Sequence, residues 1–284
     1  MSRTPLKTLL GALVTTSAML LATAVPASAI TGGEPDGDRH PNVGLIAFYD
    51  STGRYRCSAT LVSPTVLITA AHCTEGTVGS TLVSFNSVIA LAPPSPLPIA
   101  ANPSAGYTDA EITAAGFLSG TSYTHPDYSG FTDIDNWNDV GVVVLDQPVI
   151  GITPATLPGP NYLDAFAQPR LNQTIFDVVG YGTEVRKPTS GPQKPQPMSY
   201  PLIRRYTTSP GQKLSPQILQ LNGNPADPRG GGGTCFGDSG GPVFVDGILV
   251  AVASYSYTSN CRYLGGYQRV DIAVVQKWLA TFGL

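Results

Sequence analysis

The sequence is poor in charged residues and has no excess of basic ones. Lys and Arg number 16 and Asp and Glu 19 among 284 residues, so the formal net charge is −3. Nucleic acids are bound by clustered cationic side chains, which makes a nucleic-acid partner unexpected. Apolar content is ordinary, and Gly and Pro stay below the share typical of disorder. The composition therefore indicates a folded protein that is rich in turns.

Long hydrophobic runs are also scarce, since only Leu9 to Val25 qualifies. It follows Arg3 and Lys7, contains Thr, Ser and Gly, and closes on an Ala-Ser-Ala cleavage pattern. This order is typical of a secretory signal peptide rather than of the alternative, a membrane anchor. We therefore predict a signal peptide over 1–29, a secreted, extracellular protein domain over 30–284, and no membrane contact once the signal is removed.

Cysteine is rare, with four residues in the chain. An even count in an exported protein favours two disulfides over free thiols or a metal site, and four cysteines allow three pairings. We favour Cys57 with Cys73 and Cys235 with Cys261, each worth roughly 3 kcal/mol in the chain-entropy model. The sequence alone leaves the connectivity open. No metal or cofactor is expected.

The pattern of apolar and β-branched residues predicts many short strands. These runs are Val43 to Tyr49, Ala59 to Val62, Val66 to Thr69, Val140 to Leu145, Ile175 to Val179, Pro242 to Val245, Ile248 to Ala253 and Tyr267 to Val270. Asp246-Gly247 is a hairpin signal between two of them. Many short strands in series indicate an all-β sandwich or barrel.

Three segments do not follow this pattern of short strands. Near the C-terminus, Asp271 could cap a helix whose apolar positions are Val274, Val275, Trp278, Leu279 and Phe282. Ala90 to Gly120 and Thr183 to Pro201 are rich in Pro together with Ala or Lys, and we predict that both are surface loops.

One motif, Gly237-Asp238-Ser239-Gly240-Gly241, suits a nucleophile. Glycines allow a tight turn in which the N–H groups of Gly237 and Ser239 converge on a developing oxyanion. A plain glycine-rich turn is the alternative. The motif also satisfies the nucleophile-elbow pattern of the α/β-hydrolases, but that fold requires a helix after the serine, whereas Pro242 to Val245 continues as a strand.

Histidine is scarce, and this scarcity narrows the choice of a general base. Of the three histidines, His72 follows a strand directly, in Thr-Ala-Ala-His-Cys. His40 lies near the predicted new N-terminus and His125 precedes a proline, so structural roles are expected for both. Imidazole can take a hydroxyl proton near neutral pH, which makes His72 the candidate base for Ser239.

Asp139 directly precedes the apolar run that begins at Val140. A carboxylate there is costly to bury unless a partner hydrogen-bonds to it, and a histidine would be such a partner. Asp133 and Asp135 are the competing candidates. We favour Asp139 because only it abuts the strand.

Together these motifs resemble the chymotrypsin/trypsin family of serine proteases. The order of His, Asp and Ser agrees, as do Thr-Ala-Ala-His-Cys, Asn-Asp-Val-Gly-Val, Gly-Asp-Ser-Gly-Gly-Pro and Gly180-Tyr181-Gly182. The resemblance covers nearly the whole chain from Ile30 to the terminal helix. It implies two packed six-stranded antiparallel β-barrels with a C-terminal α-helix, and a serine endopeptidase acting on polypeptides as a monomer, with His72, Asp139 and Ser239 as catalytic residues.

The resemblance also implies where substrate binds. The floor of the specificity pocket would be Gly233, with walls at Ser254, Tyr255, Ser256 and Gly265. Tyr255 replaces the usual tryptophan and Ser256 a common glycine. No acidic residue occurs in Gly230 to Gly237 or Ile248 to Val270, so we expect an uncharged, apolar residue before the scissile bond rather than Lys or Arg. Arg262 could instead turn into the pocket and recruit an acidic residue.

Activation would follow from export. In the family a new N-terminal Ile places its ammonium beside the Asp that precedes the nucleophile, and Ile30 and Asp238 match these residues. Cleavage after Ala29 would expose Ile30 directly, whereas cleavage after Ala24 would leave a short propeptide, Val25 to Ala29.

Two other functions use the same scaffold. A homologue that has lost catalysis can act as a binding protein, but such a protein usually lacks one of the three catalytic residues, and all three are present here. An esterase is the other alternative, since acyl transfer does not itself separate esters from amides.

Overall fold

The computed structural model describes residues 30–185 and 198–284. The predicted signal peptide and most of the predicted loop from Thr183 to Pro201 lie outside the described residues. None of the described helices is long and apolar enough to cross a membrane.

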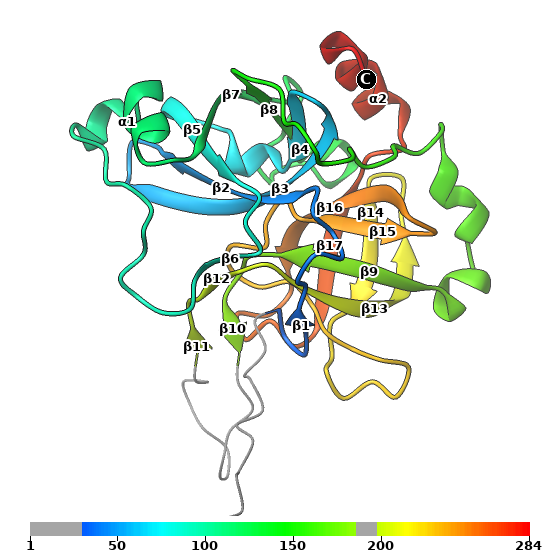
Figure 1. Ribbon diagram of the computed structural model, residues 1–284. Helices are drawn as coiled ribbons and strands as arrows, with labels where there is room; N and C mark the ends of the chain where they lie inside the picture. Colours follow the sequence, from blue (N-terminus) through cyan, green and yellow to red (C-terminus); the bar gives the residue numbers. More distant parts are fainter. Residues whose placement is uncertain (1–29, 186–197) are drawn as a thin grey trace, which may run out of the picture.

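Two barrels of antiparallel strands make up most of the molecule (Figure 1). The first closes in the order β2 (Val43–Tyr49), β3 (Arg54–Ser63), β4 (Val66–Thr69), β8 (Gly141–Leu145), β7 (Leu118–Thr124) and β5 (Val78–Ser84). The second closes in the order β13 (Arg205–Leu214), β14 (Ile218–Asn222), β17 (Leu264–Arg269), β16 (Ile248–Ser256), β15 (Pro242–Val245) and β9 (Ile175–Gly180), with β1 (Glu34–Pro35) added beside β13. The predicted fold is therefore confirmed.

Two short strand pairs form separate two-stranded sheets. β6 (Val88–Ala90) pairs with β12 (Leu202–Ile203), and β10 (Glu184–Val185) pairs with β11 (Met198–Ser199).

Burial on both faces explains the nearly continuous apolar sequence of β2. Ile46 and Phe48 belong to the cluster of the first barrel, whereas Leu45 and Ala47 belong to a second cluster that includes Val252 of the other barrel. Successive side chains of a strand point to opposite faces, so one face of β2 fills its own barrel and the other packs against the neighbouring barrel. The barrels therefore share one apolar interface.

The turn and disulfide predictions agree with the structure. Asp246 and Gly247 have φ of 53° and 76° between β15 and β16, as the predicted two-residue hairpin requires. The disulfides join Cys57 to Cys73 and Cys235 to Cys261, so the favoured pairings are confirmed.

The C-terminal helix α2 (Ala273–Leu279) is present, but its predicted cap is wrong. Ile272 is the N-cap residue and has no capping side chain. The Asp271 carboxylate instead accepts the Leu163 N–H at 2.8 Å and pairs with Arg269 at 2.8 Å. A buried carboxylate gains more from an arginine and an amide than from the helix end alone.

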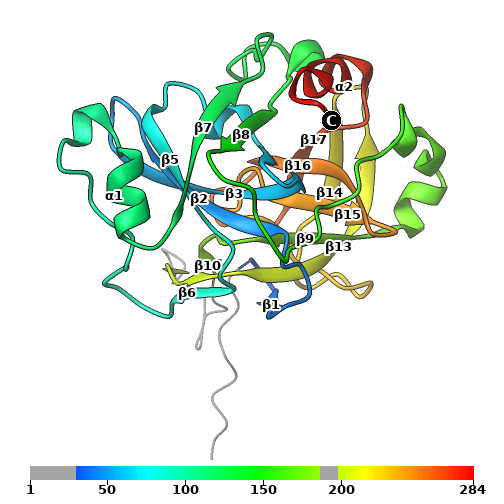
Figure 2. The same ribbon diagram turned by 45° about the horizontal axis from the view of Figure 1, so that its top comes forward.

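The helix α2 crosses back to the first barrel, as both ribbon views show (Figures 1 and 2). The ring of Trp278 lies 4.9 Å from His125, and that of Phe282 lies 5.4 Å from Tyr123.

The predicted loop between Ala90 and Gly120 contains a second helix, α1 (Asp109–Ala114). The Thr108 hydroxyl accepts the Glu111 N–H and the Glu111 carboxylate accepts the Thr108 N–H, which forms a capping box.

Candidate active site

His72 is held by the carboxylate of Asp139. It lies in a short 3-10 turn, Ala71–Cys73, after β4, and the Cys57–Cys73 disulfide ties this turn to β3. Its Nδ1 lies 2.9 Å from Asp139 Oδ2, and its backbone N–H donates to Oδ1 at 2.9 Å. Both the ring and the backbone of His72 are thereby oriented, and Nδ1 is the engaged ring nitrogen.

Asp139 is completely buried, and its partners explain how the structure tolerates it. Besides His72, the Ser254 hydroxyl donates to Oδ2 at 2.6 Å. Trp137 Nε1 in turn donates to Ser254 Oγ at 3.0 Å. These contacts offset the cost of burying the carboxylate.

The competing acidic residues do not reach His72. Asp133 and Asp135 are both exposed, and the Asp133 carboxylate accepts the N–H of Asp135 in its own turn. The structure therefore brings Asp139, rather than its neighbours, to the histidine.

The loop around Ser239 is anchored to β3. Gly237 and Gly240 have φ of +95° and +74°, which favour glycine. The Ser58 N–H donates to the Ser239 carbonyl at 2.8 Å, and the Ser58 hydroxyl donates to the Gly237 carbonyl at 3.1 Å. Within the described residues the N–H groups of Gly237 and Ser239 have no hydrogen-bond acceptor, so both can donate to an oxyanion.

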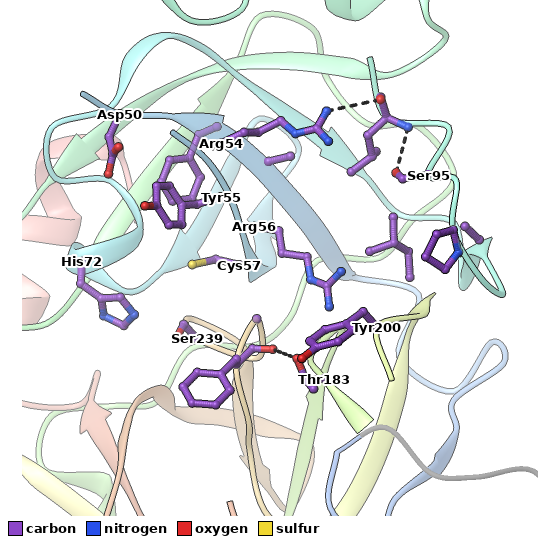
Figure 3. A pocket seen from close by; sticks show the side chains of 18 of the residues that line it. Asp50, Arg54, Tyr55, Arg56, Cys57, His72, Ser95, Thr183, Tyr200 and Ser239 are labelled. Carbon is purple, nitrogen blue, oxygen red and sulfur yellow. Dashed lines mark hydrogen bonds between the residues drawn. The ribbon is translucent and has the colours of Figure 1, made fainter. Parts of the chain in front are cut away.

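Ser239 and His72 face the same cavity, as Figure 3 shows. No hydrogen bond joins their side chains in the described part of the chain. Such contacts are often long without substrate and tighten in the substrate complex.

The family model described as Trypsin matches residues 32–279, which is most of the chain. The chain belongs to the trypsin family. It is accordingly a serine endopeptidase, as the sequence motifs predicted.

Relatives and structural neighbours agree with this assignment. The chain is 28% identical to a trypsin of Saccharopolyspora erythraea, over 80% of this chain and 86% of that one, and 27% identical to trypsin Blo t 3 of Blomia tropicalis, over 75% and 73%. Among solved structures, one titled "Structure of GrC" has a TM-score of 0.61 at 19% identity and covers 90% of this chain and 100% of its own. A structure titled HL collagenase has a TM-score of 0.59 at 17% identity, covering 89% and 97%. These two structures support the fold.

In this trypsin-family protein a cavity of about 430 Å³ opens beside the nucleophile loop. Its lining combines the predicted wall residues with hydroxyl and aromatic groups: His72, Phe131, Thr234, Cys235, Phe236, Ser239, Ala253, Ser254, Tyr255, Ser256, Thr258, Ser259 and Cys261. No Asp, Glu, Lys or Arg is among them. Among the described residues, the cavity thus offers no counter-charge to a cationic side chain.

Two predicted pocket residues do not line this cavity. Gly233 exchanges backbone hydrogen bonds with Thr31, and Gly265 packs against the ring of Tyr267, which is 2.9 Å from the position of a Cβ there. Thr234, the residue after Gly233, contributes to the lining instead. Arg262 is also absent from the lining.

Asp238 and Ile30 are both fully buried, but no hydrogen bond joins them in the described residues. The Asp238 carboxylate accepts the N–H groups of Gly182 at 2.7 Å and of Cys235 at 2.8 Å. Burial raises the pKa of Asp238 to about 7 despite these bonds and the charge of Arg56. A cationic partner beside this buried carboxylate would lower its pKa.

The remaining histidines have structural partners. His40 Nδ1 bonds to Asp36 and His125 Nδ1 accepts the Asp127 N–H. One possible metal-ligand cluster occurs in the described part of the chain, formed by His72, Cys57 and Cys73. Its sulfur atoms are joined in a disulfide, so they are not thiolate ligands.

Sequence reasoning missed two supporting residues, Phe131 and Trp137, and the second role of Ser254. Ser254 was predicted as a pocket wall, yet its hydroxyl also binds Asp139. Phe131 lies 5.5 Å from the His72 ring, and Trp137 lies 5.1 Å from Phe131. No local pattern marks these aromatic residues, because they reach the site only through a long connection between strands.

Proposed function

We propose that this chain is a secreted endopeptidase in which Ser239 forms an acyl-enzyme with polypeptide substrates. The observation that carries the proposal is the buried Asp139 bound to His72 Nδ1, with His72 and Ser239 on one cavity. This arrangement orients the ring so that Nε2 can act on the serine hydroxyl.

The proposed reaction has two halves. Ser239 Oγ attacks the scissile carbonyl carbon while its proton passes to His72 Nε2, and the N–H groups of Gly237 and Ser239 bind the oxyanion. The C–N bond then breaks and Nε2 gives its proton to the leaving amine. A water, deprotonated by Nε2, then attacks the ester carbonyl carbon. The C–O bond to Ser239 breaks, Nε2 returns the proton to Ser239 Oγ, and the acyl product leaves as a carboxylic acid.

The neutral lining of the 430 Å³ cavity supports an uncharged, apolar residue before the scissile bond. A cationic side chain would be buried there without a partner. A chromogenic panel of substrates with Phe, Leu, Ala, Arg or Glu at this position tests the proposal. A clear preference for Arg would refute it.

We further propose that signal cleavage after Ala29 places the Ile30 ammonium beside Asp238. The burial of both residues supports this pairing. N-terminal sequencing of secreted protein, with assay of a variant carrying one extra residue before Ile30, tests it. Full activity of the extended variant would refute it.

Labelling by a fluorophosphonate tests the nucleophile. Intact mass should show one adduct on the wild type and none on Ser239→Ala, because only Ser239 has a base in reach. Digestion of a denatured protein mixture by the wild type then separates an endopeptidase from an esterase or a binding homologue. Equal labelling of both proteins, or labelling without peptide cleavage, would contradict the proposal.

A further inference from the structure

A second, larger cavity of about 840 Å³ extends from the nucleophile loop on the side of Arg56 and Tyr200 (Figure 3). It shares His72, Phe236 and Ser239 with the 430 Å³ cavity. If the residue before the scissile bond occupies the smaller cavity, the segment released as the amine must occupy the larger one.

The one Asp and two Arg side chains that line this cavity differ in how they are paired. Asp50 closes its own turn, accepting the N–H of Thr52 at 2.6 Å and of Gly53 at 3.0 Å. Arg54 Nη1 donates to the Pro98 carbonyl at 2.6 Å. Both groups are thus engaged by their own chain.

Arg56 is different, since its guanidinium makes no hydrogen bond or ion pair within residues 30–185 and 198–284. The segments 1–29 and 186–197 contain no Asp or Glu, so neither can supply a carboxylate. Asp238 is the carboxylate whose charge favours the Arg56 cation, but both oxygens of Asp238 accept backbone N–H groups. Arg56 therefore keeps its donors for a ligand.

The position of Arg56 places such a ligand close to the reacting bond. Its Nε lies 3.0 Å from where a Cβ on Gly237 would be, so it lies against the residue that offers an oxyanion donor. Figure 3 shows its guanidinium on the side of the cavity where Tyr200 lies, with Ser239 and His72 toward the other side. Successive residues of an extended peptide advance by about 3.5 Å, so the first two residues after the scissile bond come within reach.

We propose that Arg56 is a specificity-determining residue that binds a carboxylate on the first or second residue after the scissile bond. This inference rests on the proposed peptidase function. A guanidinium binds a carboxylate through paired N–H donors, and partial burial strengthens that interaction. The carboxylate can be an Asp or Glu side chain or the C-terminus of a short leaving segment.

Internally quenched peptides test this preference. One set carries Glu or Gln, in turn, at each of the two positions and has an amidated C-terminus. A second set carries Gln and ends two residues after the scissile bond, either as a free acid or as an amide. The expected result is a kcat/KM ratio of about 10 for the carboxylate over its neutral partner in one or both sets, decreasing with added NaCl.

Variants assign the ratio to Arg56. Arg56→Met, which keeps the apolar stem, should bring the ratio to about 1, and Arg56→Glu should bring it below 1. Arg54→Gln is the matched control and should retain the wild-type ratio. Each ratio is measured within one variant, so a change in overall rate does not affect it. A wild-type ratio of 1 in both sets, or a ratio unchanged in Arg56→Met, would overturn the proposal.

Binding separates this proposal from the proposed function. The same peptides are titrated against Ser239→Ala by fluorescence anisotropy, with and without Arg56→Met. Discrimination that depends on Arg56, combined with no cleavage by the wild type, would support the Arg56 site and refute the peptidase function. Cleavage without any discrimination would support the peptidase function and refute the Arg56 site. Absence of both cleavage and discrimination would refute both proposals.

Discussion

The hydroxyl of Ser58 should be necessary for both stability and rate. It accepts the Tyr181 N–H at 2.9 Å and donates to the Gly237 carbonyl at 3.1 Å, and the residue is fully buried. Ser58→Ala would leave both of these backbone groups without a partner. Each orphaned buried group costs about 1–3 kcal/mol, so we expect the free energy of unfolding to fall by about 2–6 kcal/mol.

The same change should slow catalysis, because Gly237 carries one of the proposed oxyanion donors. Freeing its carbonyl from β3 lets the loop shift, and small displacements of catalytic groups reduce rates by one or two orders of magnitude. We expect kcat/KM to fall by about 10-fold. Urea unfolding in a Ser239→Ala background, which prevents autolysis, measures the stability, and an ester substrate measures the rate.

Thr60→Val is the matched control on the same face of β3. The Thr60 hydroxyl is buried and lacks a hydrogen-bond partner in the described structure, so its removal should be neutral or slightly stabilising. If Ser58→Ala lost less than about 1 kcal/mol, or no more than Thr60→Val, the reasoning from orphaned groups would be wrong.

Three further predictions concern the triad, the nucleophile loop and Asp238. Asp139→Asn should lower kcat by about 10⁴-fold at neutral pH by losing control of the His72 tautomer, whereas exposed Asp133→Asn should change it less than about 2-fold; similar losses in both would refute the assignment. Gly240→Ala places a Cβ 2.0 Å from Thr69 Oγ1 and should destabilise by about 3 kcal/mol or more, whereas Gly247→Ala, with φ +76° and open space, should cost about 1 kcal/mol by thermal unfolding; equal losses would contradict the steric argument. In the form with an extra residue before Ile30, the pKa of Asp238 is raised from 3.8 to about 7. The contribution of Asp238 to the free energy of unfolding is then fully present below pH 3.8 and is lost as pH rises to 7, a loss of up to about 4 kcal/mol. Urea midpoints between pH 4 and 8 should show this loss in the extended form and not in the form beginning at Ile30, and parallel curves would refute the pairing.

The elements that could be read from the sequence are those with strong local patterns. Strands β2, β4 and β15 begin and end at the predicted residues because each is a short and nearly continuous apolar run. β7 and β13 were missed, since Leu118–Thr124 is rich in small and polar residues and Arg205–Leu214 contains Pro and Gly. Pairing with neighbouring strands, rather than intrinsic preference, makes these segments extended.

The sequence by itself predicted the family, the two barrels and the candidate triad, because each depends on short motifs in a fixed order, whereas it favoured one disulfide pairing and left the connectivity open. Only the tertiary structure decided how these groups are supported. Asp139 and Ser254 are 115 positions apart, yet their side chains are 2.6 Å apart, and Ser58 reaches Gly237 across 179 positions. Such contacts form where two barrels meet, and a hydrogen bond between distant segments leaves no periodicity or spacing in the sequence. Arg56 is likewise an ordinary basic residue in the sequence, and only the packing around Gly237 leaves it without a partner beside the nucleophile.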